Sequence, residues 1–174
     1  MAEVVVRSLA RSDDRSGFSC GDIELDRFFQ RYAGQNQFRH HIGSTYVAVD
    51  GERILGFVTV TPGEVAGAAM SEHIRKRLPD YPLPILRVSR LAVDRHAQRR
   101  GIGEMLLRFA FGLALQLRDH FGCVGVVVDA KAGAIPFYRK LGFRPLEVIQ
   151  GTLGDRPEPL PMFLAIRRIA AAVG

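Results

Sequence analysis

A six-residue segment in the middle of the chain, Gln98-Arg99-Arg100-Gly101-Ile102-Gly103, has the residue types of an anion-binding loop. The pattern around it indicates a strand before and a helix after. That arrangement directs several backbone N–H groups and the positive end of the helix at one point. Gly101 and Gly103 allow a sharp turn and close approach of a pyrophosphate to the main chain. Arg99 and Arg100 add positive charge beside it.

Two other kinds of glycine loop are excluded by residue type. A P-loop ends in Gly-Lys-Ser/Thr, whereas this chain has Gly103-Glu104-Met105. A dinucleotide-binding fold requires three spaced glycines and a later acidic residue after a strand. On the six residues alone, a glycine turn that binds no ligand remains an alternative.

Arginine is concentrated around this loop. The net charge of +6 and the sequence pI near 9.9 favour an anionic partner, which could be nucleic acid, a nucleotide cofactor or an acidic protein. Six arginines lie within about twenty residues, and the only acidic residues among them are Asp94 and Glu104. Each of these arginines could equally belong to a solvated surface. They are Arg87, Arg90, Arg95, Arg99, Arg100 and Arg108.

The elements that must position the loop follow from hydrophobic periodicity. The sequence predicts a helix at 103–121 between two strands, 85–93 and 124–128, that are apolar on both faces, and thus a βαβ unit. Further helices are expected at 22–32 and 133–141, and a loop with one short helix at 62–84. The remaining strands are expected at 4–6, 45–49, 54–60, 143–149 and 162–166.

Together these elements predict a mixed α/β fold with six or seven strands in a central sheet and about four flanking helices. A chain of 174 residues fits a single domain, residues 1–174. Residues 1–10 hold no apolar stretch of signal-peptide length, and about eighteen apolar residues never run uninterrupted. A cytoplasmic protein without a membrane segment is therefore expected.

The two cysteines predict neither a metal site nor a disulfide framework. Cys20 and Cys123 lie far apart and form no CxxC pair. Both are expected to act as small core hydrophobes, and no metal is expected.

Three segments together resemble the GCN5-related N-acetyltransferases, the GNAT family, across nearly the whole chain. Residues 90–94 followed by 98–103 are similar to the family's Q/R-x-x-G-x-G/A coenzyme A signature. Val126 to Ala130 is similar to its fifth strand, and Phe137-Tyr138-Arg139-Lys140-Leu141-Gly142-Phe143 to its FY-x-x-x-GF ending.

The resemblance implies an enzyme that uses acetyl-coenzyme A. Backbone at Leu91, Ala92 and Val93 would line the acetyl and pantetheine arm, and residues 98–103 would bind the pyrophosphate. Tyr138 would lie near the cofactor sulfur and protonate the departing thiolate. One departure is visible: many members have Asn early in the segment after the fifth strand, where this chain reads Ala130-Lys131-Ala132-Gly133-Ala134.

A narrower resemblance is to the acetyltransferase toxins of toxin-antitoxin pairs. It is carried by residues 18–21, 25–28, 45–48, 56–57, 90–94 and 129–131. It implies acetylation of the amino group of aminoacyl-tRNA, an antitoxin partner with a ribbon-helix-helix part, and a homodimer.

Acetyl transfer needs a neutral amine close to the thioester carbonyl, donors for the developing oxyanion, and a proton for the thiolate. Backbone N–H groups near Leu91 to Val93 suit the oxyanion. Tyr138, with an ordinary pKa near 10, suits the proton donor, although its apolar neighbours Ile135, Phe137 and Leu141 also suit plain packing.

No convincing general base is present. Glu64 and Glu72 lie in the uncertain loop, and no motif includes any histidine, at 40, 41, 73, 96 or 120. The amine of an aminoacyl ester is substantially neutral at pH 7, whereas a lysine amine, with a pKa near 10.4, needs help. This favours aminoacyl-tRNA as the acceptor, with Arg87, Arg90, Arg95 and the run 75–77 contacting its phosphates.

Two other functions remain open from the sequence. One is acetylation of a small-molecule amine or a protein N-terminus without a toxin role. The other is a binding module without catalysis.

Overall fold

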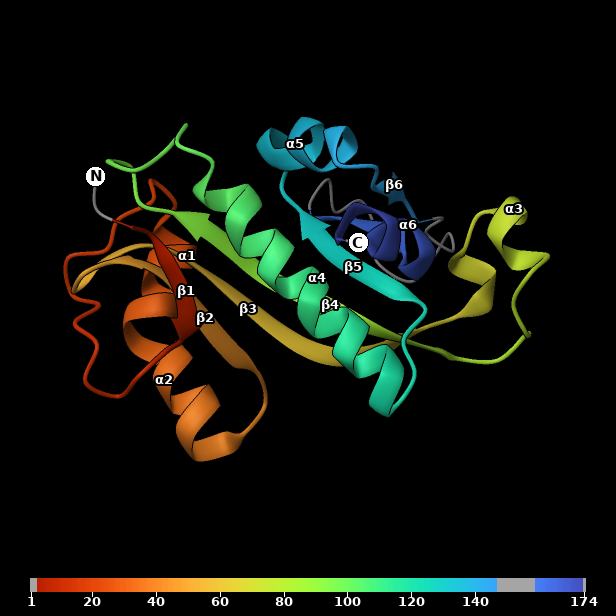
Figure 1. The fold of residues 1–174 in the computed structure, drawn as a ribbon, viewed down its shortest axis with the longest axis horizontal. Coiled ribbons are helices and arrows are strands. Elements are labelled where there is room, and N and C mark those ends of the chain that lie inside the picture. Colours follow the sequence, from red (N-terminus) through yellow and green to blue (C-terminus); the bar gives the residue numbers. More distant parts are fainter. Residues whose placement is uncertain (1–2, 147–158, 174) are drawn as a thin grey trace. The chain divides into compact units, whose positions relative to one another are not determined.

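The computed structural model of the chain describes residues 3–146 and 159–173. Seven strands in this part form a mixed sheet in the order β1-β2-β3-β4-β5-β7-β6 (Figure 1). The chain divides into two compact units, residues 1–61 with 88–112 and residues 62–87 with 113–174. Strands β3 (Arg53–Val65) and β4 (Leu83–Val93) and helix α4 (Ile102–His120) contribute residues to both.

The first unit begins with an antiparallel three-stranded arrangement. Strand β1 (Val5–Ser8) pairs with β2 (Ser44–Asp50), and β2 pairs with β3 through a turn at Gly51, whose φ is 60°. Between β1 and β2 lies one helical segment, divided into α1 (Ile23–Arg27), η1 (Phe28–Tyr32), α2 (Ala33–Gln35) and η2 (Asn36–His40). Asp22 caps its start by accepting from the N–H groups of Glu24 and Leu25.

Phenylalanines form the core of this unit. The ring of Phe29 stacks on that of Phe57 at 4.3 Å between centroids, and Phe18 meets both rings edge-on at 4.8 and 5.5 Å. All three side chains are buried. Such ring pairs add about 0.5–1.5 kcal/mol each to the free energy gained by burying apolar area.

The second unit is built on β5 (Gly125–Ala130), which pairs antiparallel with β7 (Leu160–Ala165). The short β6 (Arg144–Pro145) pairs with the other side of β7. Its helical pieces are η3 (Gly67–Ala69), α3 (Glu72–Arg75), η4 (Ala132–Ala134), α5 (Ile135–Lys140) and α6 (Ile166–Val173). Its core includes Met70, Ile85, Val127 and Phe163.

The predicted α/β architecture is confirmed, including the strands at β2, β3, β4, β5 and β7 and the helix between β4 and β5. The prediction that the first helix ends at residue 32 is wrong, since helical structure continues to His40. Gly34 lowers helix propensity, but it lies against the guanidinium of Arg15, a tertiary contact that the local pattern does not contain.

At the C-terminal end, the expected strand 143–149 is reduced to residues 144–145, and its residues 147–149 lie outside the described part. Helix α6 was not predicted; it follows β7 directly, with no glycine or proline to mark a boundary. No described helix combines the length and apolar character needed to cross a membrane. One domain over residues 1–174 stays a prediction.

Gly56 and Gly112 offer a matched test of packing in the first unit. A Cβ at Gly56 would lie 2.9 Å from the Ala92 carbonyl oxygen and 3.0 Å from a methyl carbon of Leu106, whereas a Cβ at Gly112 would meet nothing within 4 Å. Urea unfolding should show that Gly56→Ala lowers the free energy of unfolding by about 1–3 kcal/mol. Gly112→Ala should raise it by about 0.5–1 kcal/mol. Equal effects of the two substitutions would contradict the close approach at Gly56.

Candidate functional site

The loop between β4 and α4 has a backbone shape that suits an anion. Arg99 and Gly101 have φ values of 65° and 80°, and Arg99 is one of two non-glycine residues in the described part with positive φ. A left-handed residue among right-handed ones turns successive N–H groups toward the same side. The Gly101 carbonyl accepts from Met105 N–H at 3.0 Å, so the helix begins here, where its first N–H groups have no helical acceptor.

A buried carboxylate holds the start of this loop. Asp94 is 6% exposed, and its two oxygens accept from the N–H groups of Ser19 at 3.2 Å and His96 at 2.9 Å. Its own N–H donates to the Leu55 carbonyl at 2.8 Å, and Arg95 N–H donates to the Ser19 carbonyl at 2.8 Å. The chain therefore leaves β4 in one defined direction.

The side chain of Gln98 also holds the loop. Its amide nitrogen Nε2 lies 3.2 Å from both the Cys20 and the Val93 carbonyl oxygens. A contribution of Gln98 to pyrophosphate binding would therefore come from its backbone. Burial, and then a hydrogen bond with Asp26, raises the pKa of the Cys20 thiol to about 11, so this cysteine stays protonated.

The other predicted cofactor residues differ in exposure. Arg99, Arg100 and Gly101 are exposed, whereas Ile102 is 2% exposed and its side chain belongs to the core. The nearby Glu104 forms an ion pair with Arg108 at 3.1 Å, which leaves less negative charge facing the loop. At the end of β4, Ala92 is buried and Leu91 and Val93 are half-buried. Their role in holding a cofactor stays a prediction.

Tyr138 lies in the second unit, on the short helix α5 that has Pro136 in its first turn. It is 5% exposed, and its ring meets those of Phe137 and Phe143 edge-on at 5.2 and 5.5 Å. Burial, followed by the negative charge of Asp129, raises the pKa of the phenol well above its ordinary value near 10. The raised pKa means that the phenol stays protonated to higher pH than an exposed tyrosine does.

Asp129 is the residue that sequence reasoning missed at this site. The Arg87 nitrogen Nη1 lies 2.9 Å from both carboxylate oxygens of Asp129, and both side chains are about a third exposed. Arg87, expected to contact substrate, thus already has a counter-charge. The available signal was the position of Asp129, a charged residue directly after the apolar run Val126–Val128.

The other two arginines that were predicted to contact the substrate, Arg90 and Arg95, have different local environments. The guanidinium carbon of Arg90 lies 3.7 Å from the centroid of the Phe28 ring, and burial lowers the pKa of Arg90. Arg95 is exposed, and its backbone bonds to Ser19. Their contact with substrate stays a prediction.

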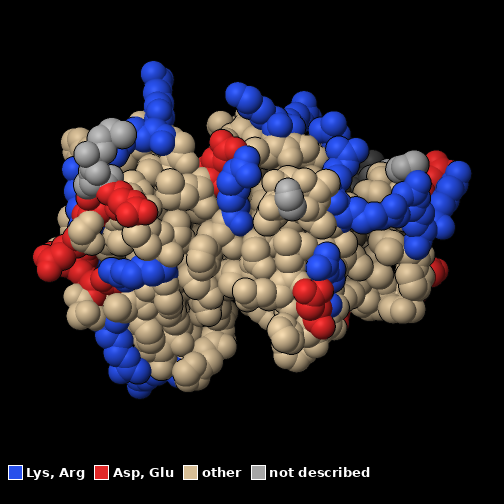
Figure 2. Space-filling model, viewed as in Figure 1, with Lys and Arg blue, Asp and Glu red and all other residues tan. Residues whose placement is uncertain are grey.

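The second unit carries a basic surface. Figure 2 shows Lys and Arg side chains gathered over α3 and α5. The exposed basic residues of those segments are Arg75, Lys76, Arg77, Arg139 and Lys140. The predicted run 75–77 is therefore accessible to a polyanion.

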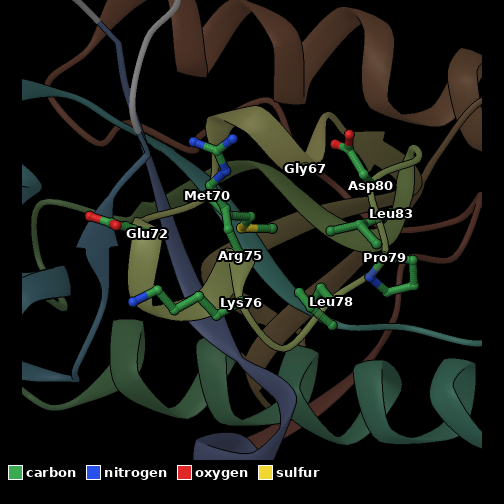
Figure 3. A pocket seen from close by; sticks show the side chains of 9 residues that line it. All are labelled: Gly67, Met70, Glu72, Arg75, Lys76, Leu78, Pro79, Asp80 and Leu83. Carbon is green, nitrogen blue, oxygen red and sulfur yellow. The ribbon is translucent and has the colours of Figure 1, made fainter.

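A pocket of ≈ 450 Å³ lies beside α3 in the same unit (Figure 3). Met70, Leu78 and Leu83 form its apolar part, and the carboxylates of Glu72 and Asp80 lie on opposite sides of it in this view. Within residues 3–146 and 159–173, no three His, Cys, Asp or Glu side chains are grouped as metal ligands require.

No described candidate base lies in a buried position. Glu64, Glu72, His40, His41, His96 and His120 are all exposed, and the side chain of His73 lies outside the described part.

Replacing Asp129 should lower the pKa of Tyr138. Asp129→Asn removes the negative charge that opposes ionisation of the phenol, so tyrosinate absorbance should develop at lower pH than in the wild type. The same shift makes the stability of the protein depend on pH. Because the pKa of Tyr138 is higher in the folded than in the unfolded chain, its contribution to the free energy of unfolding declines as pH rises above about 10.

Two variants serve as controls for this titration. Tyr138→Phe removes the transition under study, and Asp119→Asn removes an exposed carboxylate of α4 that pairs with Arg118. A titration of Asp129→Asn identical to that of Asp119→Asn would show that Asp129 does not act on Tyr138.

Known proteins that are similar to this chain fall in one family. The acetyltransferase (GNAT) domain family matches residues 41–145. A curated tRNA-acetylating toxin of Mycobacterium tuberculosis is 36% identical over 124 residues, 71% of this chain and 74% of that protein.

Two solved structures align with nearly the whole chain, each at 26% identity. A mutant of KacT superposes with a TM-score of 0.84, over 97% of this chain and 98% of KacT. AtaTR bound with acetyl-CoA gives 0.79, over 98% of both chains. The chain belongs to the GNAT family of acetyltransferases.

Proposed function

We propose that this acetyltransferase transfers the acetyl group of acetyl-coenzyme A to the amino group of an aminoacyl-tRNA, and so acts as a toxin that blocks translation. The observation that carries the proposal is the loop from Gln98 to Gly103, with its two left-handed residues at the start of α4. The 36% identity to a tRNA-acetylating toxin supports the choice of acceptor.

The residues of the loop fit a pyrophosphate. Its exposed members, Arg99 and Arg100, are cations, and the nearest following acid, Glu104, is paired with Arg108. Backbone N–H groups at the beginning of a 19-residue helix favour negative charge. When bound, acetyl-coenzyme A supplies a thioester whose carbonyl carbon accepts an amine.

In the proposed reaction, the chain's own groups position the two substrates and stabilise the charge that develops during acetyl transfer. Backbone N–H groups at Leu91 to Val93 donate toward the oxygen that gains charge as the amine attacks. Tyr138 donates its phenolic proton to the leaving sulfur. The ester of an aminoacyl group lowers the pKa of its amine, so a dedicated base is not needed at neutral pH.

The basic surface of the second unit supports an RNA acceptor over a small amine. Exposed Arg75, Lys76, Arg77, Arg139 and Lys140 could contact several phosphates, which a small molecule lacks. Acetylation of a small amine or a protein N-terminus is the alternative function.

The proposed binding partners of the protein are a ribbon-helix-helix antitoxin, a second copy of the chain in a homodimer, and charged tRNA. The proposed location is the cytoplasm, where charged tRNA is found. The likeness to AtaTR, whose structure holds acetyl-CoA, supports the cofactor. Sedimentation of the purified chain tests the dimer.

The acceptor is tested by incubating the protein with labelled acetyl-CoA and each charged tRNA. At least one aminoacyl-tRNA should be acetylated, and Tyr138→Phe should lower kcat about 10²-fold, because it removes the proton donor but keeps the ring. Wild-type protein that leaves every charged tRNA unmodified but acetylates small amines would establish the alternative function.

The cofactor loop is tested by Gly101→Val. A β-branched residue at φ 80° is strained by about 1–3 kcal/mol, so the loop should rearrange although space is open around the new Cβ. Calorimetry should show an acetyl-CoA Kd about tenfold higher, equivalent to about 1.4 kcal/mol. Gly112→Ala, in the middle of α4, should leave the Kd unchanged. An unchanged Kd in Gly101→Val would contradict the assignment of the loop.

A further inference from the structure

A hollow of ≈ 420 Å³ on the first unit carries three arginines. It lies between the segment after β1 and the last turns of the helical segment, and it shares no residue with 91–93 or 98–103. Its lining contains no carboxylate. The lining residues are Arg11, Arg15, Gly34, Gln35, Phe38 and Arg39.

Arg15 is held in place at the inner side of this hollow. Its Nη1 donates to the Phe29 carbonyl oxygen at 2.9 Å, where the helix widens into the π-helical turn η1. The guanidinium lies flat against Gly34, so close that a Cβ there would be 2.9 and 3.2 Å from its two terminal nitrogens. Because a guanidinium has five N–H donors, one carbonyl bond leaves others for a ligand.

The other two cations stand at the outer side. Arg11 lies over the ring of Phe38, 5.1 Å from its centroid, and both Arg11 and Arg39 are exposed. The nearby acids have other hydrogen-bond donors: Asp13 accepts from Arg7 at 2.7 and 2.8 Å, and Asp14 accepts from Ser16 at 2.6 Å. Asp13 also attracts the charge of Arg15 electrostatically. The charge of the three arginines is therefore only partly compensated.

From this arrangement we infer that the arginine pocket, residues 11, 15 and 39 around Gly34, binds a backbone phosphate of the RNA acceptor. This inference rests on the proposed function. Guanidinium groups pair with phosphate oxygens through two parallel hydrogen bonds, and three such groups around one hollow suit a single phosphate. An acidic peptide is the competing ligand for the same guanidinium groups, and the test below separates it from RNA.

The test replaces only the two exposed cations, since Arg15 also supports the helix. The variant Arg11→Gln/Arg39→Gln is compared with Arg27→Gln/Arg31→Gln, which removes the same amount of charge from exposed positions of the helical segment that lie outside the pocket. Fluorescence anisotropy of labelled tRNA is measured over a range of salt concentrations. The pocket variant should raise the Kd about tenfold and reduce the salt slope by about 1, as expected for one lost phosphate contact.

The control variant should change the Kd less than about twofold, and both variants should keep the wild-type Kd for acetyl-CoA. Equal tRNA binding by the two variants would overturn the inference, even if the wild type acetylates tRNA normally. Titrations with inorganic pyrophosphate and with poly-glutamate test the other anions. If the pocket variant loses binding of only one of these two anions and keeps wild-type tRNA binding, the inference is also overturned. Wild-type protein that neither binds nor acetylates tRNA would instead refute the proposed function, and this inference with it.

Discussion

The loop between β4 and α4 begins at one buried carboxylate. Asp94 sits where β4 ends, and its oxygens accept from the backbone of Ser19 and His96 while its N–H donates to Leu55 in β3. Leaving a buried charge without its donors costs several kcal/mol, so the segment around Ser19 and the loop are held together. The left-handed residues Arg99 and Gly101 then follow from a fixed starting direction.

A second carboxylate organises the other unit in a different way. Asp129 pairs with Arg87 and also opposes ionisation of the buried Tyr138. The pair shows how one acidic residue can serve both charge balance and proton retention. Arg87 thus balances Asp129 within the second unit, whereas Arg90 stacks on Phe28 within the first.

Much of this fold could be predicted because its strands and longest helix have strong periodicity. The apolar runs of β4 and β5 and the spacing of apolar residues in α4 identified the βαβ unit. Gly101 indicated the sharp turn, which its φ of 80° confirms. The helix beyond residue 32 could not be predicted, since Gly34 argues locally against it and Arg15 supports it from a distant segment. Helix α6 was missed because nothing in its residues separates it from β7.

By itself, the sequence determined the α/β class, the position of the sharp turn at Gly101 and the family, because these depend on residue types within short windows. Only the tertiary structure decided what the polar side chains do. It placed Gln98 on two backbone carbonyls, gave Arg87 a counter-charge and brought Arg11, Arg15 and Arg39 around one hollow. Such contacts join residues far apart in the chain, and the energy of a charge is set by its neighbours in space.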